Sequence, residues 1–246
     1  IITMSDESQT PYEGANVKVQ DQMVTVDGNN VFITPHFGVL KPKTTYFIAI
    51  PEGFITNTTL NGVAFTGFSN NKDAANSWIF TTKSAEKIRK TIKVDSSESS
   101  RSDFRTIYGA LAAIGNKEGD YTIKLAEGTY RELIHFKGVA NITIEGPAKN
   151  NRGDNCVIQY TNINAWNGST SLRPVFFFQA GNLVLKNLTI KNTCIRGVST
   201  KTADTQAETI YFKNDTGTFA AYNCSFKSHQ DTILTSGRNW FYNCYI

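Results

Sequence analysis

The sequence has 246 residues, of which 40% are hydrophobic and 19% charged, proportions typical of a globular rather than a disordered protein. Its formal charge of +4 is not concentrated in a block of Lys and Arg, which argues against a nucleic-acid-binding protein but fits an anionic polymer as partner. No apolar run approaches the roughly 20 residues that span a membrane. Because the chain starts at Ile1 without Met or a signal sequence, we expect a processed chain or an internal fragment.

Residues 1–83 predict an all-β unit with the strand spacing of a β-sandwich. Turn signals such as Asn61-Gly62 separate the candidate strands. These strands are Ala15–Val19, Met23–Val26, Val31–Thr34, Thr45–Ile50 and Ser77–Thr82.

Motifs in this half resemble bacterial immunoglobulin-like (Ig-like) modules that accompany carbohydrate-active enzymes. In such modules a Pro-x-Thr-x-Tyr strand precedes a closing Trp-x-Phe-x-Thr strand. The matching residues are Pro42, Thr44, Tyr46, Trp78, Phe80 and Thr82. The resemblance implies an Ig-like β-sandwich module over residues 1–84. It also implies a bacterial protein that is secreted, to the periplasm or the cell surface.

A charged and serine-rich segment follows, and we place the domain boundary near residue 85, with the second domain over residues 85–246. Between Phe104 and Ile114, apolar residues recur at i, i+3, i+4, i+7 and i+10, which predicts a helix. Asp103 or Ser102 is the expected N-cap, and Gly115 is expected to end the helix. Such a helix would cover one end of the structure that follows.

From residue 121 onward, strands recur without helices between them. The expected strands are Tyr121–Leu125, Asn141–Glu145, Cys156–Tyr160, Val175–Gln179, Leu183–Leu185, Leu188–Lys191, Glu208–Phe212, Phe219–Phe226, Thr232–Leu234 and Trp240–Ile246. Four asparagines share one register, with apolar residues at −2, +1 and +3: Asn141, Asn187, Asn223 and Asn243. Their unequal spacing fits coils of a solenoid with loops of varying length.

This register predicts a right-handed parallel β-helix, in which each asparagine lies at a bend and bonds the matching asparagine of the next coil. The alternative is a large antiparallel sandwich, which would not require a shared Asn register. Four cysteines show no CxxC spacing, which argues against zinc, and each lies in or beside an apolar strand. We expect them to be buried free thiols.

Four motifs in this second half resemble the pectinesterase (pectin methylesterase) family, in family order over about residues 91–246. Gly128–Glu132 matches its Gly-x-Tyr-x-Glu motif, Asn187–Thr193 matches an Asn-rich strand, and Gln206-Ala207 opens its Gln-Ala-x-Ala motif. The sequence from Gln230 matches the hallmark Gln-Asp-Thr, followed by an aromatic-rich strand that ends in Cys-x-Ile. Each motif is weak alone, and the set is specific.

The resemblance implies an enzyme that removes methyl esters from the galacturonate units of pectin, without a metal or other cofactor. One aspartate attacks the ester carbonyl, and a second protonates the departing methanol and then deprotonates water. By resemblance Asp231 is this acid/base, while Gln230 and Gln206 stabilise the oxyanion. Thr170 and Trp166 are candidate substrate-binding residues. The alternative for Asp231 is that it merely caps a turn of the coil.

Two departures from the family pattern affect the expected activity. Thr209 stands at the second Ala of Gln-Ala-x-Ala, preceded by Glu208, which we expect on a coil edge, the alternative being that it projects toward the groove. The nucleophile's Asp-Phe-Ile-(Phe/Trp)-Gly motif and the later Gly-Arg-Pro-Trp motif do not occur in residues 1–246. We therefore expect an incomplete β-helix with little or no esterase activity, whose uncapped last coil could favour self-association.

Two other functions are weighed against this one. The first is a non-catalytic carbohydrate-binding β-helix protein, which would not need the missing nucleophile motif. The second is another β-helix enzyme such as a pectate lyase, which would need Ca²⁺-binding acidic clusters on successive coils. The sequence shows no such cluster, so the lyase ranks last.

Overall fold

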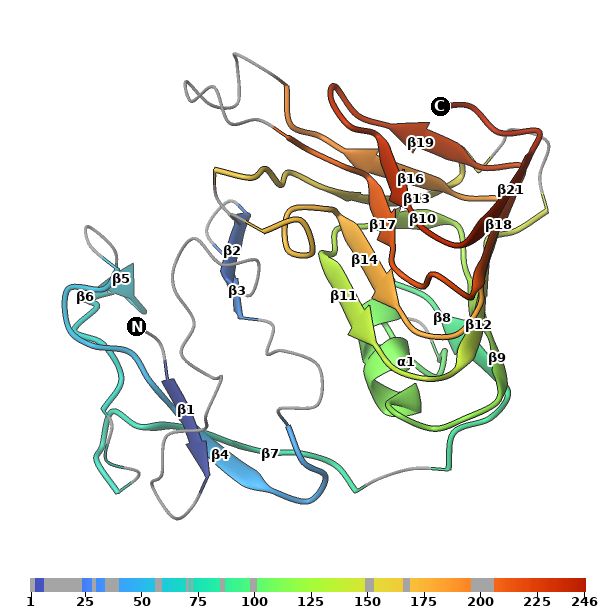
Figure 1. The fold of residues 1–246 in the computed structure, drawn as a ribbon. Coiled ribbons are helices and arrows are strands. Elements are labelled where there is room, and N and C mark those ends of the chain that lie inside the picture. The colour runs from blue at the N-terminus through green and yellow to red at the C-terminus, as the bar shows by residue number, and fades with distance from the viewer. Residues whose placement is uncertain are drawn as a thin grey trace. The chain divides into compact units, whose positions relative to one another are not determined.

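The computed structural model describes residues 3–6, 24–27, 30–33, 40–55, 59–69, 71, 73–84, 87–97, 101–148, 153–165, 169–195 and 206–246. The chain divides into two compact units, Ile1–Glu86 and Lys87–Ile246. No helix in these ranges is long and apolar enough to cross a bilayer. Figure 1 shows the strands of both units.

The first unit contains antiparallel strands. β1 (Thr3–Asp6), β4 (Thr45–Ala49) and β7 (Trp78–Thr81) form a sheet in the order β1-β4-β7. Two hairpins accompany it, formed by β2 (Val24–Asp27) with β3 (Asn30–Ile33) and by β5 (Thr59–Leu60) with β6 (Val63–Ala64). The expected turn at Asn61-Gly62 joins β5 and β6 with φ angles of 51° and 81°, as a tight hairpin turn requires. The expected strand Ala15–Val19 lies outside the described residues.

The second unit is a right-handed parallel β-helix, in which successive coils add strands to three sheets (Figure 1). The six-stranded sheet contains β8 (Thr91–Val94), β9 (Asp120–Leu125), β12 (Asn141–Glu145), β15 (Leu183–Lys186), β18 (Thr218–Tyr222) and β21 (Arg238–Tyr242). The second sheet contains β10 (Gly128–Tyr130), β13 (Cys156–Tyr160), β16 (Thr189–Asn192) and β19 (Ser225–Lys227). The third contains β11 (Ile134–Lys137), β14 (Phe176–Gln179), β17 (Ile210–Phe212) and β20 (Ile233–Thr235).

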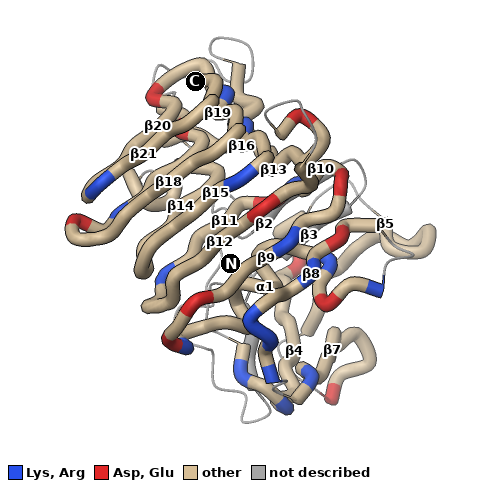
Figure 2. Tube along the Cα trace, turned by 90° about the vertical axis from the view of Figure 1, so that its right-hand side faces the viewer, with Lys and Arg blue, Asp and Glu red and all other residues tan. Residues whose placement is uncertain are grey.

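Every pairing between the described strands of this unit is parallel, so the antiparallel sandwich alternative is wrong. Figure 2 shows the coils stacked side by side, with positive and negative residues interspersed along them. Alternate residues of each strand point into the coil interior. There Phe136, Phe178 and Phe212 stack on successive coils, with ring centroids 5.4 and 6.1 Å apart. This continuous apolar interior holds the coils in register.

The predicted asparagine ladder is confirmed for three of its four members. Asn187, Asn223 and Asn243 each follow a strand of the six-stranded sheet and have positive φ angles of 53°, 54° and 52°. Asn223 donates to Asn187 Oδ1 at 3.2 Å, and Asn243 donates to Asn223 Oδ1 at 2.8 Å. The placement of Asn141 in this ladder is wrong. Asn141 is the first residue of β12, and it bonds Asp120 and Asn182 at the start of the strands, whereas the ladder lies where the strands end. Gly146 occupies the bend after β12 and accepts from Asn187.

Replacing Asn223 by alanine is expected to lower the free energy of unfolding by about 2–4 kcal/mol, from the lost side-chain bonds and the strained left-handed backbone. Asn223→Gly removes the same bonds without the backbone strain, so it should cost about 1 kcal/mol less. Urea denaturation of the two variants measures the difference. Equal losses would show that the left-handed bend does not govern the effect.

The helix begins later than the sequence predicts. α1 spans Ile107–Ile114 and ends at Gly115 as expected, but its N-cap is Thr106, whose Oγ1 accepts from Gly109 N at 3.0 Å. Phe104 instead forms a bridge with Val94 of β8, so the chain is extended where a helical turn was expected. The apolar face of α1 packs against β8 and β11 and so covers the N-terminal end of the β-helix.

Glu132 of the Gly-x-Tyr-x-Glu motif holds the start of this helix. Its carboxylate oxygens accept from the backbone N–H groups of Ile107 and Tyr108, both at 2.9 Å. Tyr130 is buried and donates to backbone carbonyls of Val94 and Ala126. These contacts give the motif a structural role.

The contribution of Glu132 to stability is expected to depend on pH. Burial raises the pKa of its carboxyl from about 4.5 to about 7, against the lowering effect of the two N–H donors. Since the folded pKa lies above the unfolded one, this stabilising contribution is fully present below pH 4.5 and is lost as the pH rises through about 7. Thermal unfolding at a series of pH values should show this decline in wild type and a flatter profile in Glu132→Gln. Identical profiles would contradict the assignment.

The four cysteines are free, as expected. Cys156, Cys194 and Cys224 are buried, whereas Cys244 is only half-buried. The expectation of burial therefore holds for three of the four.

Candidate active site

The candidate site lies where the chain enters β14, β17 and β20, three neighbouring strands of one sheet. Backbone hydrogen bonds align these entries: Phe176 N donates to Thr209 O and Thr209 N donates to Thr232 O, both at 2.9 Å. Residues far apart in sequence therefore meet on consecutive coils. The segments concerned are 173–175, 206–209 and 228–232.

Asp231 directly precedes Thr232 and has a left-handed backbone, with φ of 52°. Among side-chain types, Asp tolerates this conformation comparatively well, and residues held there often lie at functional sites. The turn is held by Ser228, whose Oγ donates to Ala207 O and accepts from Gln230 N at 3.3 Å. Asp231 is exposed, and no described residue binds its carboxylate. The carboxylate is therefore accessible to a ligand.

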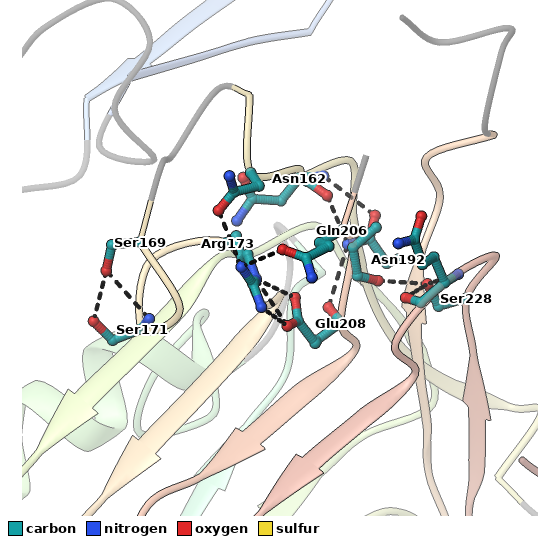
Figure 3. Close-up of polar contacts among 11 residues, drawn as sticks. Asn162, Ser169, Ser171, Arg173, Asn192, Gln206, Glu208 and Ser228 are labelled. Atoms are coloured by element: carbon teal, nitrogen blue, oxygen red, sulfur yellow. Dashed lines mark hydrogen bonds and ion pairs between the residues drawn. The ribbon is translucent and has the colours of Figure 1, made fainter. Parts of the chain in front are cut away.

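Gln206 and Glu208 lie on the coil before Asp231 and share one partner, Arg173 (Figure 3). Arg173 Nε donates to both carboxylate oxygens of Glu208 at 2.8 and 2.9 Å, and its Nη2 lies 2.6 Å from Oε1. Its Nη1 donates to Gln206 Oε1 at 2.6 Å. Glu208 is only 1% exposed, so the expectation that it lies on an open coil edge is wrong. Burial of this carboxylate requires the charged partner that Arg173 supplies.

Two buried asparagines tie these segments together. Asn162 Nδ2 donates to the carbonyls of Leu172 and Pro174, next to Arg173. Asn192 Nδ2 donates to Asn162 O at 2.8 Å and to Glu208 O at 3.2 Å. Asn192 belongs to the motif Asn187–Thr193, so the motif could have indicated its role. Asn162 has no comparable signal in the sequence.

The residues singled out from the sequence divide into two groups. Gln206, Gln230 and Asp231 lie in segments that are bonded to each other at the entries of the adjacent strands β17 and β20. Thr209, the departure from the family motif, is buried and donates through Oγ1 to Thr232 O at 2.6 Å. Thr170 is exposed in the turn that precedes β14, apart from these bonds. Trp166 lies outside the described residues.

An open groove of about 730 Å³ adjoins the site and shares Ser228, His229 and Thr232 with it. Its wall includes Lys191 and Lys227, which lie side by side in register on the parallel strands β16 and β19. Lys227 also pairs with Asp154 at 3.3 Å. These cationic groups suit an anionic ligand. Within the described ranges no three His, Cys, Asp or Glu side chains are grouped to hold a metal ion.

The site can be compared with known proteins. The family model described as Pectinesterase matches residues 93–246. The chain is 27% identical over 147 residues to "Probable pectinesterase A" of Aspergillus fumigatus, which covers 58% of this chain and 43% of that protein. The chain thus spans less than half the length of this curated relative.

Two solved structures share the fold. The pectin methylesterase from Aspergillus niger superposes with a TM-score of 0.54 at 21% identity, over 65% of this chain and 50% of that one. The pectin methylesterase PemA from Erwinia chrysanthemi gives 0.52 at 23% identity, over 62% and 48%. At this level of identity the structural similarity shows a shared fold, the parallel β-helix, and nothing more.

Proposed function

The chain belongs to the pectinesterase family, and we propose that it supplies the acid/base and oxyanion-binding groups of a site that removes methyl esters from pectin. The observation that supports this proposal is that the segments carrying Gln206, Gln230 and Asp231 lie on adjacent coils, bonded to each other at the entries of β17 and β20. Amide donors beside an accessible carboxylate are the groups that ester cleavage by an aspartate mechanism needs.

In the proposed reaction a carboxylate nucleophile adds to the ester carbonyl carbon, and negative charge develops on the carbonyl oxygen. Gln206 and Gln230 donate hydrogen bonds to that oxygen. When the C–O bond to methoxide breaks, Asp231 gives its proton to the leaving oxygen, which departs as methanol. Asp231 then takes a proton from water as the water cleaves the acyl intermediate. Galacturonate and the free nucleophile result.

Residues 1–246 are proposed to release methanol slowly or not at all. Glu208 is a carboxylate residue on the neighbouring strand entry, directly before Thr209, which is bonded to Thr232. It is 1% exposed and pairs with Arg173, so an ester cannot reach it. No Asp-Phe-Ile-(Phe/Trp)-Gly motif occurs in the sequence. We propose that a form of the protein which also contains this motif is the active methylesterase.

The first unit is the basis for a proposal about the origin and location of the protein. Residues 1–84 would form an Ig-like module of a secreted bacterial protein that works in the periplasm or at the cell surface. The motif from Pro42 to Thr82 supports this, and Tyr46 stacks on Phe80 between β4 and β7. Self-association of residues 1–246 through β21 is also proposed, since Trp240 and Tyr242 are exposed there.

Calorimetric titration tests the substrate class. Residues 1–246 are expected to bind a methyl-esterified hexagalacturonide at least about tenfold more tightly than a neutral β-glucan hexamer. Methanol release measured in parallel should stay near the background of a heat-inactivated sample. Equal affinity for the two sugars would refute the proposed substrate, and rapid methanol release would refute the need for a further nucleophile.

A further inference from the structure

The side-chain amide of Gln206 is held in one orientation. Its Oε1 accepts from Nη1 of Arg173 at 2.6 Å. A guanidinium has only donors, so the oxygen and never the NH₂ group of the amide can face Arg173. The Nε2 donors of Gln206 therefore point away from the arginine. An unanchored glutamine could turn its oxygen toward a substrate as readily as its nitrogen.

Arg173 is itself fixed by protein groups. Beyond Gln206, it donates through Nε and Nη2 to Glu208 and through Nη1 to Asn164 Oδ1 at 3.1 Å. Its side chain is 12% exposed, against 1% for Glu208. Figure 3 shows the guanidinium bonded to both Gln206 and Glu208. With its donors engaged in this way, Arg173 is placed to orient Gln206 rather than to bind a carboxylate of the substrate.

We propose that the Arg173–Glu208 pair is a positioning device, which presents Nε2 of Gln206 as a preorganised donor to the ester oxyanion. This inference rests on the proposed function, because it assumes that Gln206 faces the reacting carbonyl. Oxyanion stabilisation depends on donors that are already oriented before charge develops. A buried ion pair contributes little net stability compared with an apolar pair of similar volume. Stability alone therefore does not account for the buried ion pair, whereas the orientation of Gln206 does.

The test removes both charges together, in Arg173→Met/Glu208→Leu, so that no unpaired charge stays buried. The matched control is Lys124→Met/Glu145→Gln, which removes the exposed ion pair between β9 and β12. The measurement is ¹⁵N relaxation of the Gln206 side-chain amide in residues 1–246, together with its shift on addition of methyl-esterified hexagalacturonide. Arg173→Lys serves as a second variant, since it keeps one donor for Gln206 if the double variant does not fold.

In wild type and in the control, we expect a Gln206 side-chain order parameter above about 0.8, the range of rigid groups. In Arg173→Met/Glu208→Leu it should fall below about 0.6 with an unchanged melting temperature, and Arg173→Lys should give an intermediate value. The ligand-induced shift of Gln206 should be lost in the double variant while that of Gln230 persists.

A Gln206 amide that stays rigid in either Arg173 variant would overturn the positioning role. The proposed function fails in a different way, namely if wild type binds no methylated oligomer at all. In that case the order parameters, which need no ligand, still decide whether Arg173 orients Gln206.

Discussion

Replacing Asp231 by asparagine is expected to lower the kcat for methanol release by about 10²–10⁴-fold, the usual contribution of a general acid/base. The assay applies to a form of the protein that also contains the nucleophile motif. Asparagine has the size of aspartate and tolerates the left-handed φ of 52° at this position, so the fold should be kept. What it lacks is a proton for departing methanol and a base for the incoming water.

The matched control for this variant is Asp215→Asn, the same chemical change at another aspartate. Asp215 is exposed in the turn between β17 and β18, at the far end of β17 from the site, and has no part in the proposed reaction. Its replacement should leave turnover near that of wild type. Near-normal turnover in Asp231→Asn would contradict the acid/base assignment.

Replacing Glu208 alone by alanine is expected to lower the free energy of unfolding by about 3–5 kcal/mol, because Arg173 is left largely buried without its counter-charge. The control is Glu145→Ala, which breaks the more exposed pair with Lys124. That change should cost no more than about 1 kcal/mol. Urea denaturation followed by intrinsic fluorescence measures both, and similar losses would show that burial does not set the cost.

The sequence predicts most of the β-helix, because apolar and polar residues alternate in a strand that buries one face. This alternation is visible in each strand whatever the length of the loops between strands. The prediction misses β10 and β11, which are only three and four residues long. It also merges β18 and β19 into one strand over Phe219–Phe226, because apolar residues continue through the bend at Asn223. The alternation of apolar and polar residues alone does not show where a short strand ends and the chain bends into the next sheet.

Two predictions from local sequence patterns are wrong because tertiary contacts override the patterns. An Asn followed by alternating apolar residues occurs at the bend after β18 and also at the start of β12, so the pattern wrongly includes Asn141 in the ladder. The apolar stripe of the helix extends back to Phe104, which pairs with Val94 instead. In both cases contacts with another coil or strand decide the outcome, and local sequence does not contain them.

The candidate site was only partly predictable. Motifs identify Gln206, Gln230 and Asp231, but the ion pair between Arg173 and Glu208 joins residues that are 35 positions apart. Each of the two lies just before an apolar strand. That shared position was the available signal, and it becomes informative only once β14 and β17 are known to be neighbours.

The most direct test of the proposed site is an NMR titration of ¹⁵N-labelled residues 1–246 with methyl-esterified hexagalacturonide. We expect the largest shifts at the side-chain amides of Gln206 and Gln230 and at the backbone of Asp231, with little change on β8 and β9 at the other end of the β-helix. Shifts confined to β8 and β9, or to residues 1–84, or no shifts at saturating ligand, would contradict the assignment of the site.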